Sequence, residues 1–472
     1  MKRTLREHGP FRGNEPGLKE AVMKMQLSFF SVAVGFLALV ALCHTPAEAV
    51  PSFARQTGLA CNGCHTTPPE LNSAGRRFKL LGYTDRAEET ATVSNKPAER
   101  HAGLELLRSL PLSAMFETSL TGTKASQPGT QNGTFELPQD ISLFLAGAWG
   151  SHIGSFLQIT YDKQADHFSI DNTDIRFADK STLGGKELVY GLTLNNNPTV
   201  EDLWHTTPAW GFPWIGSDSA PTPAAAPLIQ GALAQDVAGI GAYAMWNEHL
   251  YVAATIYASD HVGSPRPSSG SGFATNIHGV APYWRVAWQQ SLDADNDLEV
   301  GTYGMQVRSS PNSVSGIEDR FTDWAVDLQY DRIVLVRDVL SVRATYVRES
   351  SSLDATFGQG GAAQPAHHLS LFTANVGYHF GNVFSVTAGV QDVTGTVDAL
   401  LWAPTAVTGS ATGSPNSTAY IGNLSWWPIQ NLQIAAQYTA YTRFNGSATN
   451  YDGSGRNASD NNTIYLLARF IF

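Results

Sequence analysis

The sequence predicts an all-β protein: a sixteen-stranded antiparallel β-barrel of the porin-like, outer-membrane kind, preceded by a small N-terminal segment of different character. Three observations support this fold class. From Pro111 to the end, apolar and polar residues alternate with a period of two, as strands with one lipid-facing side require. The connections between these runs alternate between short and long. After residue 49 no apolar stretch is long enough for a membrane-spanning helix, so strands must be the spanning elements.

We expect each strand to have about ten residues, with apolar side chains toward lipid and polar side chains toward the lumen. The predicted strands lie at residues 111–121, 140–149, 153–162, 167–177, 186–195, 237–246, 249–258, 279–290, 297–308, 320–331, 338–348, 368–380, 383–393, 417–427, 430–441 and 461–472. A soluble β-sandwich or solenoid also alternates, so the connections must separate these folds.

The connections favour the barrel. Short, turn-like links occur at Gly150-Ser151, Asn247-Glu248, Gly381-Asn382 and Pro428-Ile429. Long links rich in Gly, Ser, Thr, Asn and Pro occur at 196–236, 259–278, 349–367, 394–416 and 442–460. Short turns on one side and long loops on the other are typical of outer-membrane barrels. We therefore expect both termini in the periplasm and the long loops, 196–236 especially, outside the cell.

Residues 1–49 have the pattern of a secretory signal peptide. Lys24 precedes the apolar run Leu27–Leu42, and Ala47-Glu48-Ala49 provides a small-x-small cleavage site. A start at Met23 or Met25 would give a signal peptide of conventional length. An alternative interpretation is therefore that translation starts there and that residues 1–22 are a mis-assigned start. The first 49 residues hold six Lys/Arg and four Asp/Glu, which leaves 24 basic and 37 acidic residues, a net charge of −13. Such an acidic exported protein is unsuited to nucleic acid and better suited to cations.

Cys61-Asn62-Gly63-Cys64-His65 is a C-x-x-C-H motif, the attachment site of a c-type haem. Two thiols at this spacing add to the two vinyl groups of one porphyrin, and the adjacent His presents a ring nitrogen to the iron. A zinc site would need a second ligand pair, and no other cysteine remains after cleavage. A thioredoxin-type pair would not require His65. The motif predicts one covalent haem c, with His65 as the iron ligand.

The sequence therefore divides into a signal peptide at 1–49, a cytochrome c segment with its linker at 50–100, and the barrel at 101–472. About fifty residues are too few to form an independent hydrophobic core without a disulfide, metal or cofactor to stabilise it. The haem would supply part of such a core. The apolar residues available to pack on it are Phe53, Leu59, Leu71, Phe78, Leu80, Leu81 and Tyr83. A short basic helix is expected over 72–81.

The sixth iron ligand is open between two residues. Met115 points into the lumen if Leu112, Ala114 and Phe116 face lipid, and the alternative is that Met115 only packs against the haem or the plug. His101, in the linker, is the other candidate. Candidate lumen acids for a cation are Glu117, Asp162, Asp171 and Asp174, although porin lumens are polar in any case.

Three segments resemble a known family, the fused outer-membrane monohaem cytochrome–porins, which include the ferrous-iron oxidases of iron-oxidising bacteria. They are Pro51–Tyr83 around the haem motif, Gly191–Trp214, and the ending Asn461–Phe472, which also resembles an outer-membrane assembly signal. The resemblance implies electron transfer from an extracellular donor, Fe(II) in the best-known members, to a periplasmic cytochrome or cupredoxin. Family members commonly have Phe at the positions of Pro68 and Ala74, so we expect looser haem packing and an altered potential here.

An iron:cytochrome oxidoreductase in the outer membrane is the function that these features favour, with outer-membrane lipid around the barrel. Two alternatives stay open. One is a conduit that runs outward to an extracellular acceptor, and the other is a diffusion porin in which the haem only plugs the pore. No G-x-S-x-G or H-E-x-x-H motif supports a hydrolase.

Overall fold

The computed structural model describes residues 50–85, 91–93, 104–106, 110–260, 276–311, 316–381 and 383–472. Residues Ala47–Phe472 belong to one compact unit. The predicted signal peptide and His101 lie outside the described residues. No helix within the described ranges is long and apolar enough to cross a membrane.

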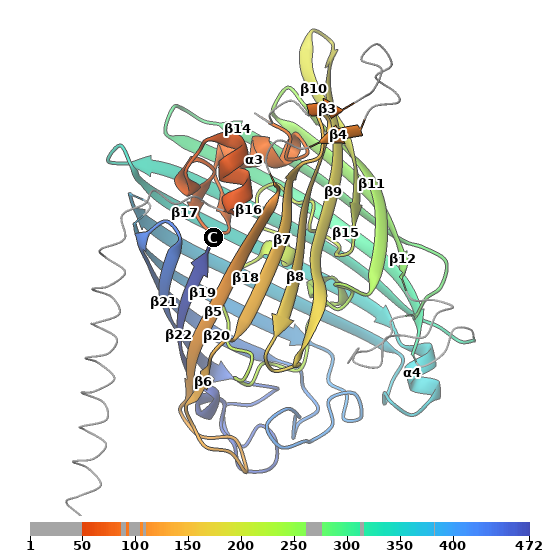
Figure 1. Cartoon of the computed structure of the whole chain (residues 1–472). Helices are drawn as coiled ribbons and strands as arrows, with labels where there is room; N and C mark the ends of the chain where they lie inside the picture. The colour runs from red at the N-terminus through yellow and green to blue at the C-terminus, as the bar shows by residue number, and fades with distance from the viewer. Residues whose placement is uncertain are drawn as a thin grey trace, which may run out of the picture. The chain divides into compact units, whose positions relative to one another are not determined.

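This unit is a closed antiparallel barrel (Figure 1). Over the described residues the wall has sixteen long strands. Two short strands, β6 (Thr134–Glu136) and β13 (Asn276–Ile277), pair only with the ends of longer strands and are not counted among the sixteen. The strands are β5 (Leu112–Thr123), β7 (Asp140–Ala148), β8 (Ile153–Asp162), β9 (His167–Leu183), β10 (Lys186–Asn195), β11 (Val237–Trp246), β12 (Leu250–Ser259), β14 (Ala281–Ser291), β15 (Asn296–Ser310), β16 (Asp319–Val334), β17 (Asp338–Ser352), β18 (Ala366–Phe380), β19 (Phe384–Gly395), β20 (Ser417–Ile429), β21 (Leu432–Arg443) and β22 (Thr463–Ile471). β22 pairs with β5 and closes the ring.

The side-chain alternation explains why the barrel lies in a membrane. Along β11, Ile240 is 54% exposed, whereas its neighbours Gly239 and Gly241 face inward and are buried. Outward-facing apolar residues recur around the wall, among them Leu192, Trp284, Val376 and Leu466, and together they form an apolar exterior. A closed barrel satisfies every wall hydrogen bond internally, and its apolar exterior matches lipid. The wall thus has the closed form and the apolar exterior of an outer-membrane barrel.

The predicted strands are confirmed, with corrections at their ends. β9 and β15–β18 run several residues beyond the predicted limits. The turn predicted at Pro428-Ile429 belongs to β20, and the chain turns at Gln430-Asn431 instead. Residues 104–106 form β4 (Leu104–Leu106), which pairs with β3 (Ala91–Val93) and not with the wall. The barrel wall therefore begins at Leu112, later than the predicted boundary at 101.

The expectation that 196–236 is an external loop is wrong. This segment, called the luminal loop below, folds inside the barrel and contacts inward-facing residues of distant strands. Thr345 on β17 donates a hydrogen bond to the backbone of Thr206, and Gln391 on β19 donates to that of Phe212. Leu203 and Trp204 are each 1% exposed. The loop turns inward because the lumen offers partners for its buried carboxylates and an apolar patch for its Leu and Trp side chains.

Residues 50–85, called the N-terminal segment below, fill the mouth of the barrel on the side of the short turns (Figure 1, red to orange). Arg77 pairs with Glu248 in the β11–β12 turn, and Tyr243 donates to the backbone of Leu80. The segment contains α2 (Pro51–Thr57), η1 (Cys61–Gly63), β1 (His65–Thr67), β2 (Glu70–Leu71) and α3 (Ser73–Leu80). The predicted basic helix is confirmed as α3, with Asn72 accepting the Gly75 N–H as its N-cap.

Candidate functional site

A cavity of about 490 Å³ lies where the N-terminal segment, the luminal loop and the barrel wall meet. Cys61, Cys64 and His65 all line it, so the structure brings the three predicted site residues to one space. Most of the remaining lining is apolar or aromatic, including Phe53, Leu59, Leu71, Phe78, Phe144, Phe156, Trp210, Trp214 and Ile471. The volume falls within the range of roughly 300–1,000 Å³ that small-molecule and cofactor sites occupy.

The barrel and α3 fix the backbone that carries the two cysteines. Cys64 N–H bonds to the Cys61 carbonyl at 3.1 Å within η1, and Cys61 N–H bonds to Gln430 Oε1 at 2.8 Å. α3 packs directly on the motif: a Cβ added to Gly75 would lie 2.2 Å from the Cys64 carbonyl oxygen. Only glycine permits this approach, which explains the glycine in the first turn of a helix.

His65 begins the small hairpin that β1 and β2 form. Burial lowers the pKa of His65 to about 4, and the neighbouring backbone of Glu70 and Pro69 only partly opposes this. The ring is therefore neutral at pH 7, the form that offers a nitrogen lone pair to a metal. Two cysteines at C-x-x-C spacing, a neutral imidazole and an apolar cavity of this size fit a covalently attached haem.

The hairpin is also anchored from the barrel wall. Glu70 is fully buried and pairs with Arg343 on β17, and its Oε2 lies 3.4 Å from Nε2 of His379 on β18. Burial raises the pKa of Glu70 to about 7, against the opposing effect of the Arg343 charge. The carboxyl thus ties the hairpin to two strands that follow it by about 270 residues or more in sequence.

Other predicted residues separate into those at the cavity and those away from it. Met115 lines the cavity, which confirms its inward direction. Phe53, Phe78 and Tyr83 also line the cavity. Their rings pack on one another, and the ring centroids of Phe53 and Phe78 lie 4.9 Å apart. Leu80 and Leu81 belong instead to an apolar cluster with Val189 of β10 and Trp204 of the luminal loop. Pro68 lines the cavity but Ala74 is exposed, so a ring missing at residue 74 cannot loosen the packing there.

The luminal loop supplies lining residues that the sequence reasoning placed outside the cell: His205, Pro208, Trp210 and Trp214. The ring of His205 stacks on Trp210 at 4.6 Å and 11°, and its Nδ1 lies 2.7 Å from the Pro69 carbonyl oxygen. Three Trp residues occur within 204–214, which is unusual for an external loop. This cluster was the feature of the sequence that could have indicated a buried loop.

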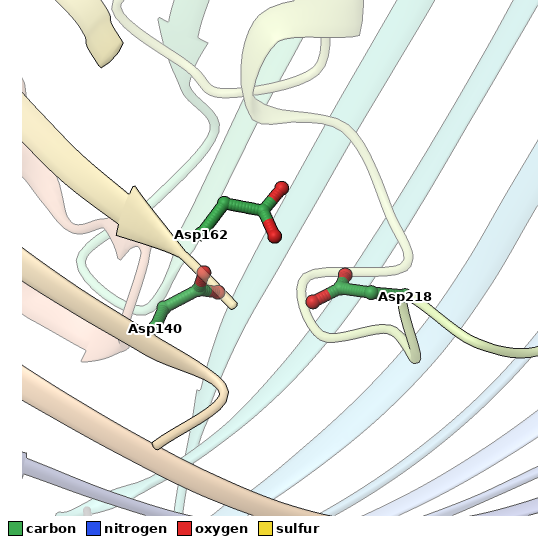
Figure 2. Close-up of side chains that lie close together, drawn as sticks. All are labelled: Asp140, Asp162 and Asp218. Atoms are coloured by element: carbon green, nitrogen blue, oxygen red, sulfur yellow. The ribbon is translucent and has the colours of Figure 1, made fainter. Parts of the chain in front are cut away.

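A second feature lies where the middle of the luminal loop meets the ends of two wall strands. Among the described residues, one group of three acids places carboxylate oxygens within 4.8 Å of one another: Asp140 of β7, Asp162 of β8 and Asp218 of the luminal loop (Figure 2). Burial, together with Asp162 and Glu136, raises the pKa of Asp218 to about 6. Carboxylate oxygens are ligands that hard divalent cations accept.

Of the four predicted lumen acids, only Asp162 belongs to this group. Glu117 pairs with Arg469, and Asp171 accepts hydrogen bonds from Thr160 and Gln235. Asp174 is fully buried, pairs with Arg176 at 2.8 Å and accepts the Tyr83 hydroxyl at 2.7 Å. Asp174 therefore holds the N-terminal segment in place. The sequence did not indicate Asp140 or Asp218. Asp140 lies at the start of β7 and Asp218 in the luminal loop, and no local sequence pattern shows that these two positions come together.

A scan of protein-family models and a search of curated proteins find no match to this chain. Solved structures with a similar fold include the outer membrane channel DcaP of Acinetobacter baumannii, at 11% identity and a TM-score of 0.44 over 76% of this chain and 96% of that one. The trimer form of OmpT, an outer membrane protein of Vibrio cholerae, matches at 9% identity and a TM-score of 0.42, over 76% and 98% of the two chains.

Proposed function

We propose that this chain is an outer-membrane electron-transfer protein with one haem c attached through Cys61 and Cys64 and ligated by His65. The single observation that carries this proposal is the convergence of these three side chains on an apolar cavity inside a membrane barrel. A haem bound there would supply one-electron redox chemistry. The resemblance to the cytochrome–porin family, read from Pro51–Tyr83, points the same way.

The chain's own residues would provide what such a site needs. The aromatic group of the half-buried Phe53 and the buried Phe78 and Tyr83 keeps water from one side of the cavity. Gln430 and α3 hold the motif backbone, so little reorganisation accompanies electron transfer. Met115 remains the candidate for the sixth ligand among the described residues, and a thioether there would favour a high potential.

We infer that the donor is extracellular Fe(II) and the acceptor a periplasmic cytochrome or cupredoxin. Each Fe(II) that is oxidised releases one electron, which the chain passes across the membrane to the acceptor. An acidic lumen would attract a cation, and ferric product formed outside would not precipitate in the periplasm. A wide diffusion pore is less consistent with a lumen that holds both the N-terminal segment and the luminal loop.

Attachment is tested first. The chain is expressed with a c-type haem maturation system, and the denatured protein is stained for covalent haem. We expect staining of the wild type and of N62A, a control at an exposed position inside the motif. The C61A/C64A variant should assemble as a barrel without staining. Stain retained by C61A/C64A would disprove attachment at this motif.

Donor and direction are tested by stopped-flow mixing of the oxidised wild type with Fe(II), followed at the haem absorption band. We expect reduction of the haem within the acidic to neutral range, and reoxidation on adding an oxidised periplasmic cytochrome. If Fe(II) reduces nothing between acidic and neutral pH, the outward conduit becomes the better description. A large conductance of the reconstituted wild type would instead support a diffusion porin.

A further inference from the structure

The luminal loop contacts the hairpin that carries His65 at the Pro69 carbonyl. His205 Nδ1 lies 2.7 Å from this oxygen, and the two residues are 136 positions apart in the chain. Pro69 follows His65 by four residues, in the turn between β1 and β2. His65 and Pro69 line the same cavity, and the buried Nδ1 of His65 has no hydrogen-bond partner among the described residues. Two histidine rings therefore approach the same short stretch of backbone.

The contacts of His205 define which of its nitrogens carries the proton. A carbonyl oxygen only accepts hydrogen bonds, so Nδ1 must carry the proton and donate to Pro69. Nε2 is then the acceptor, and it faces the ammonium group of Lys79 at 3.2 Å. Lys79 donates a further bond to the Val200 carbonyl at 2.8 Å and lies over the Trp210 ring.

These contacts leave the His205 ring little freedom. It is 5% exposed, is stacked on Trp210, and has a partner at each nitrogen. Lys79 comes from α3 and Pro69 from the hairpin, so His205 is clamped between two parts of the N-terminal segment. A ring held in this way acts on its acceptor as a fixed donor rather than as a mobile side chain.

We propose that His205 is a positioning residue for His65: its N–H occupies the Pro69 carbonyl, so the buried Nδ1 of His65 does not find an acceptor there. This inference rests on the proposed function, since it requires a haem iron bound to His65. A ligating histidine that donates its second N–H to a strong acceptor becomes a more basic ligand. A more basic ligand stabilises the oxidised iron and lowers the potential.

The proposal predicts the direction in which the haem potential changes when His205 is replaced. With His205 in place, part of the Pro69 acceptor capacity is taken, His65 is a weaker electron donor, and the haem potential is higher. Without the His205 N–H, the Pro69 carbonyl is free to accept from the His65 ring, and the potential falls. The luminal loop, which is part of the barrel, would in this way hold the haem at a potential suited to a high-potential donor.

The test measures the haem midpoint potential by spectroelectrochemistry of purified, haem-loaded variants at fixed pH. His205→Phe keeps a flat ring against Trp210 but removes the N–H donor, and His205→Gln restores an N–H donor. His249→Phe is the matched control, because His249 also stacks on a Trp, Trp288 at 5.3 Å, and also contacts a carbonyl, that of Gln289 at 3.0 Å, away from the cavity. His205→Leu replaces the Phe variant should that variant fail to assemble.

We expect a lower potential for H205F or H205L than for the wild type, a return toward the wild-type potential for H205Q, and no shift for H249F. Equal potentials in H205F and wild type, with covalent haem retained, would overturn the role of His205 and leave the proposed function standing. A shift of the same size in H205F, H205Q and H249F would also overturn it. A wild-type chain without covalent haem would overturn the proposed function itself.

Discussion

A buried arginine on the barrel wall binds a carboxylate of the luminal loop, and a substitution can remove this contact. Arg285 on β14 is fully buried, forms two bonds with Asp327 at 2.8 and 2.9 Å, and lies 3.2 Å from Glu299 and 3.1 Å from Asp202 of the loop. Arg285→Met keeps a long apolar side chain but leaves three buried carboxylates without their shared counter-charge. We expect the loop to leave the wall.

The loss of docking free energy in Arg285→Met can be estimated from the burial of the Arg285 cluster. Removing one partner of a buried ion pair costs about 3–5 kcal/mol, because the remaining charge is desolvated and unpaired. With about 1.4 kcal/mol for each factor of ten, the ratio of docked to undocked loop falls roughly 140- to 3,700-fold. By contrast, Arg308 is 56% exposed and lies 3.8 Å from Glu318, so Arg308→Met should cost only about 0–1 kcal/mol.

Two measurements report on the loop. Conductance of the reconstituted protein in planar bilayers should rise in R285M and stay at the wild-type level in R308M. Chymotrypsin should cut R285M faster at Trp204 and Trp210, which the loop buries or half-buries in the wild type. The double variant R285M/D202N, which removes the unpaired charge on the loop, should recover part of both effects.

The reasoning would be refuted by an R285M barrel that assembles, as judged by heat-modifiable migration, and keeps wild-type conductance and cleavage. Such a result would mean that the apolar contacts of Trp204 are sufficient to hold the loop, and that the arginine cluster contributes little. An equal change in R285M and R308M would likewise contradict the role assigned to burial.

Three further outcomes are expected. Tyr83→Phe removes a hydrogen bond of 2.7 Å to the buried Asp174 carboxylate and should cost roughly 1.5–3 kcal/mol of the free energy that holds the N-terminal segment, measured by chemical denaturation. Gly75→Ala should abolish haem staining while the barrel still assembles, because its Cβ would meet the Cys64 carbonyl at 2.2 Å; undiminished stain would contradict the packing of α3 on the motif. The pKa of Asp218 is raised to about 6 from an ordinary 3.8, so the folded loop binds this proton more tightly than the released loop does. Loop docking should therefore weaken as the pH rises from about 4 to 6, seen as increasing conductance, and Asp218→Asn should flatten that dependence.

The sequence alone was sufficient for the wall of the barrel. Alternation with a period of two is a local property, since each side chain faces lipid or lumen according to its position along its own strand. All sixteen strands were predicted within a few residues over most of their lengths, although the extensions of β9 and β15–β18 were missed. The C-x-x-C-H motif is also local, because its chemistry depends on spacing over five residues.

Only the tertiary structure decided what fills the barrel. Composition marked 196–236 as an external loop, but its direction depends on partners such as Arg285 and Thr345, which lie on strands far along the chain. The link between His205 and Pro69 spans 136 positions, and that between Glu70 and Arg343 spans 273. Contacts of this kind leave no periodic trace in the sequence, because each depends on the closure of the barrel. Closure brings strands and loop together around one lumen, and that shared space creates the cavity beside the motif.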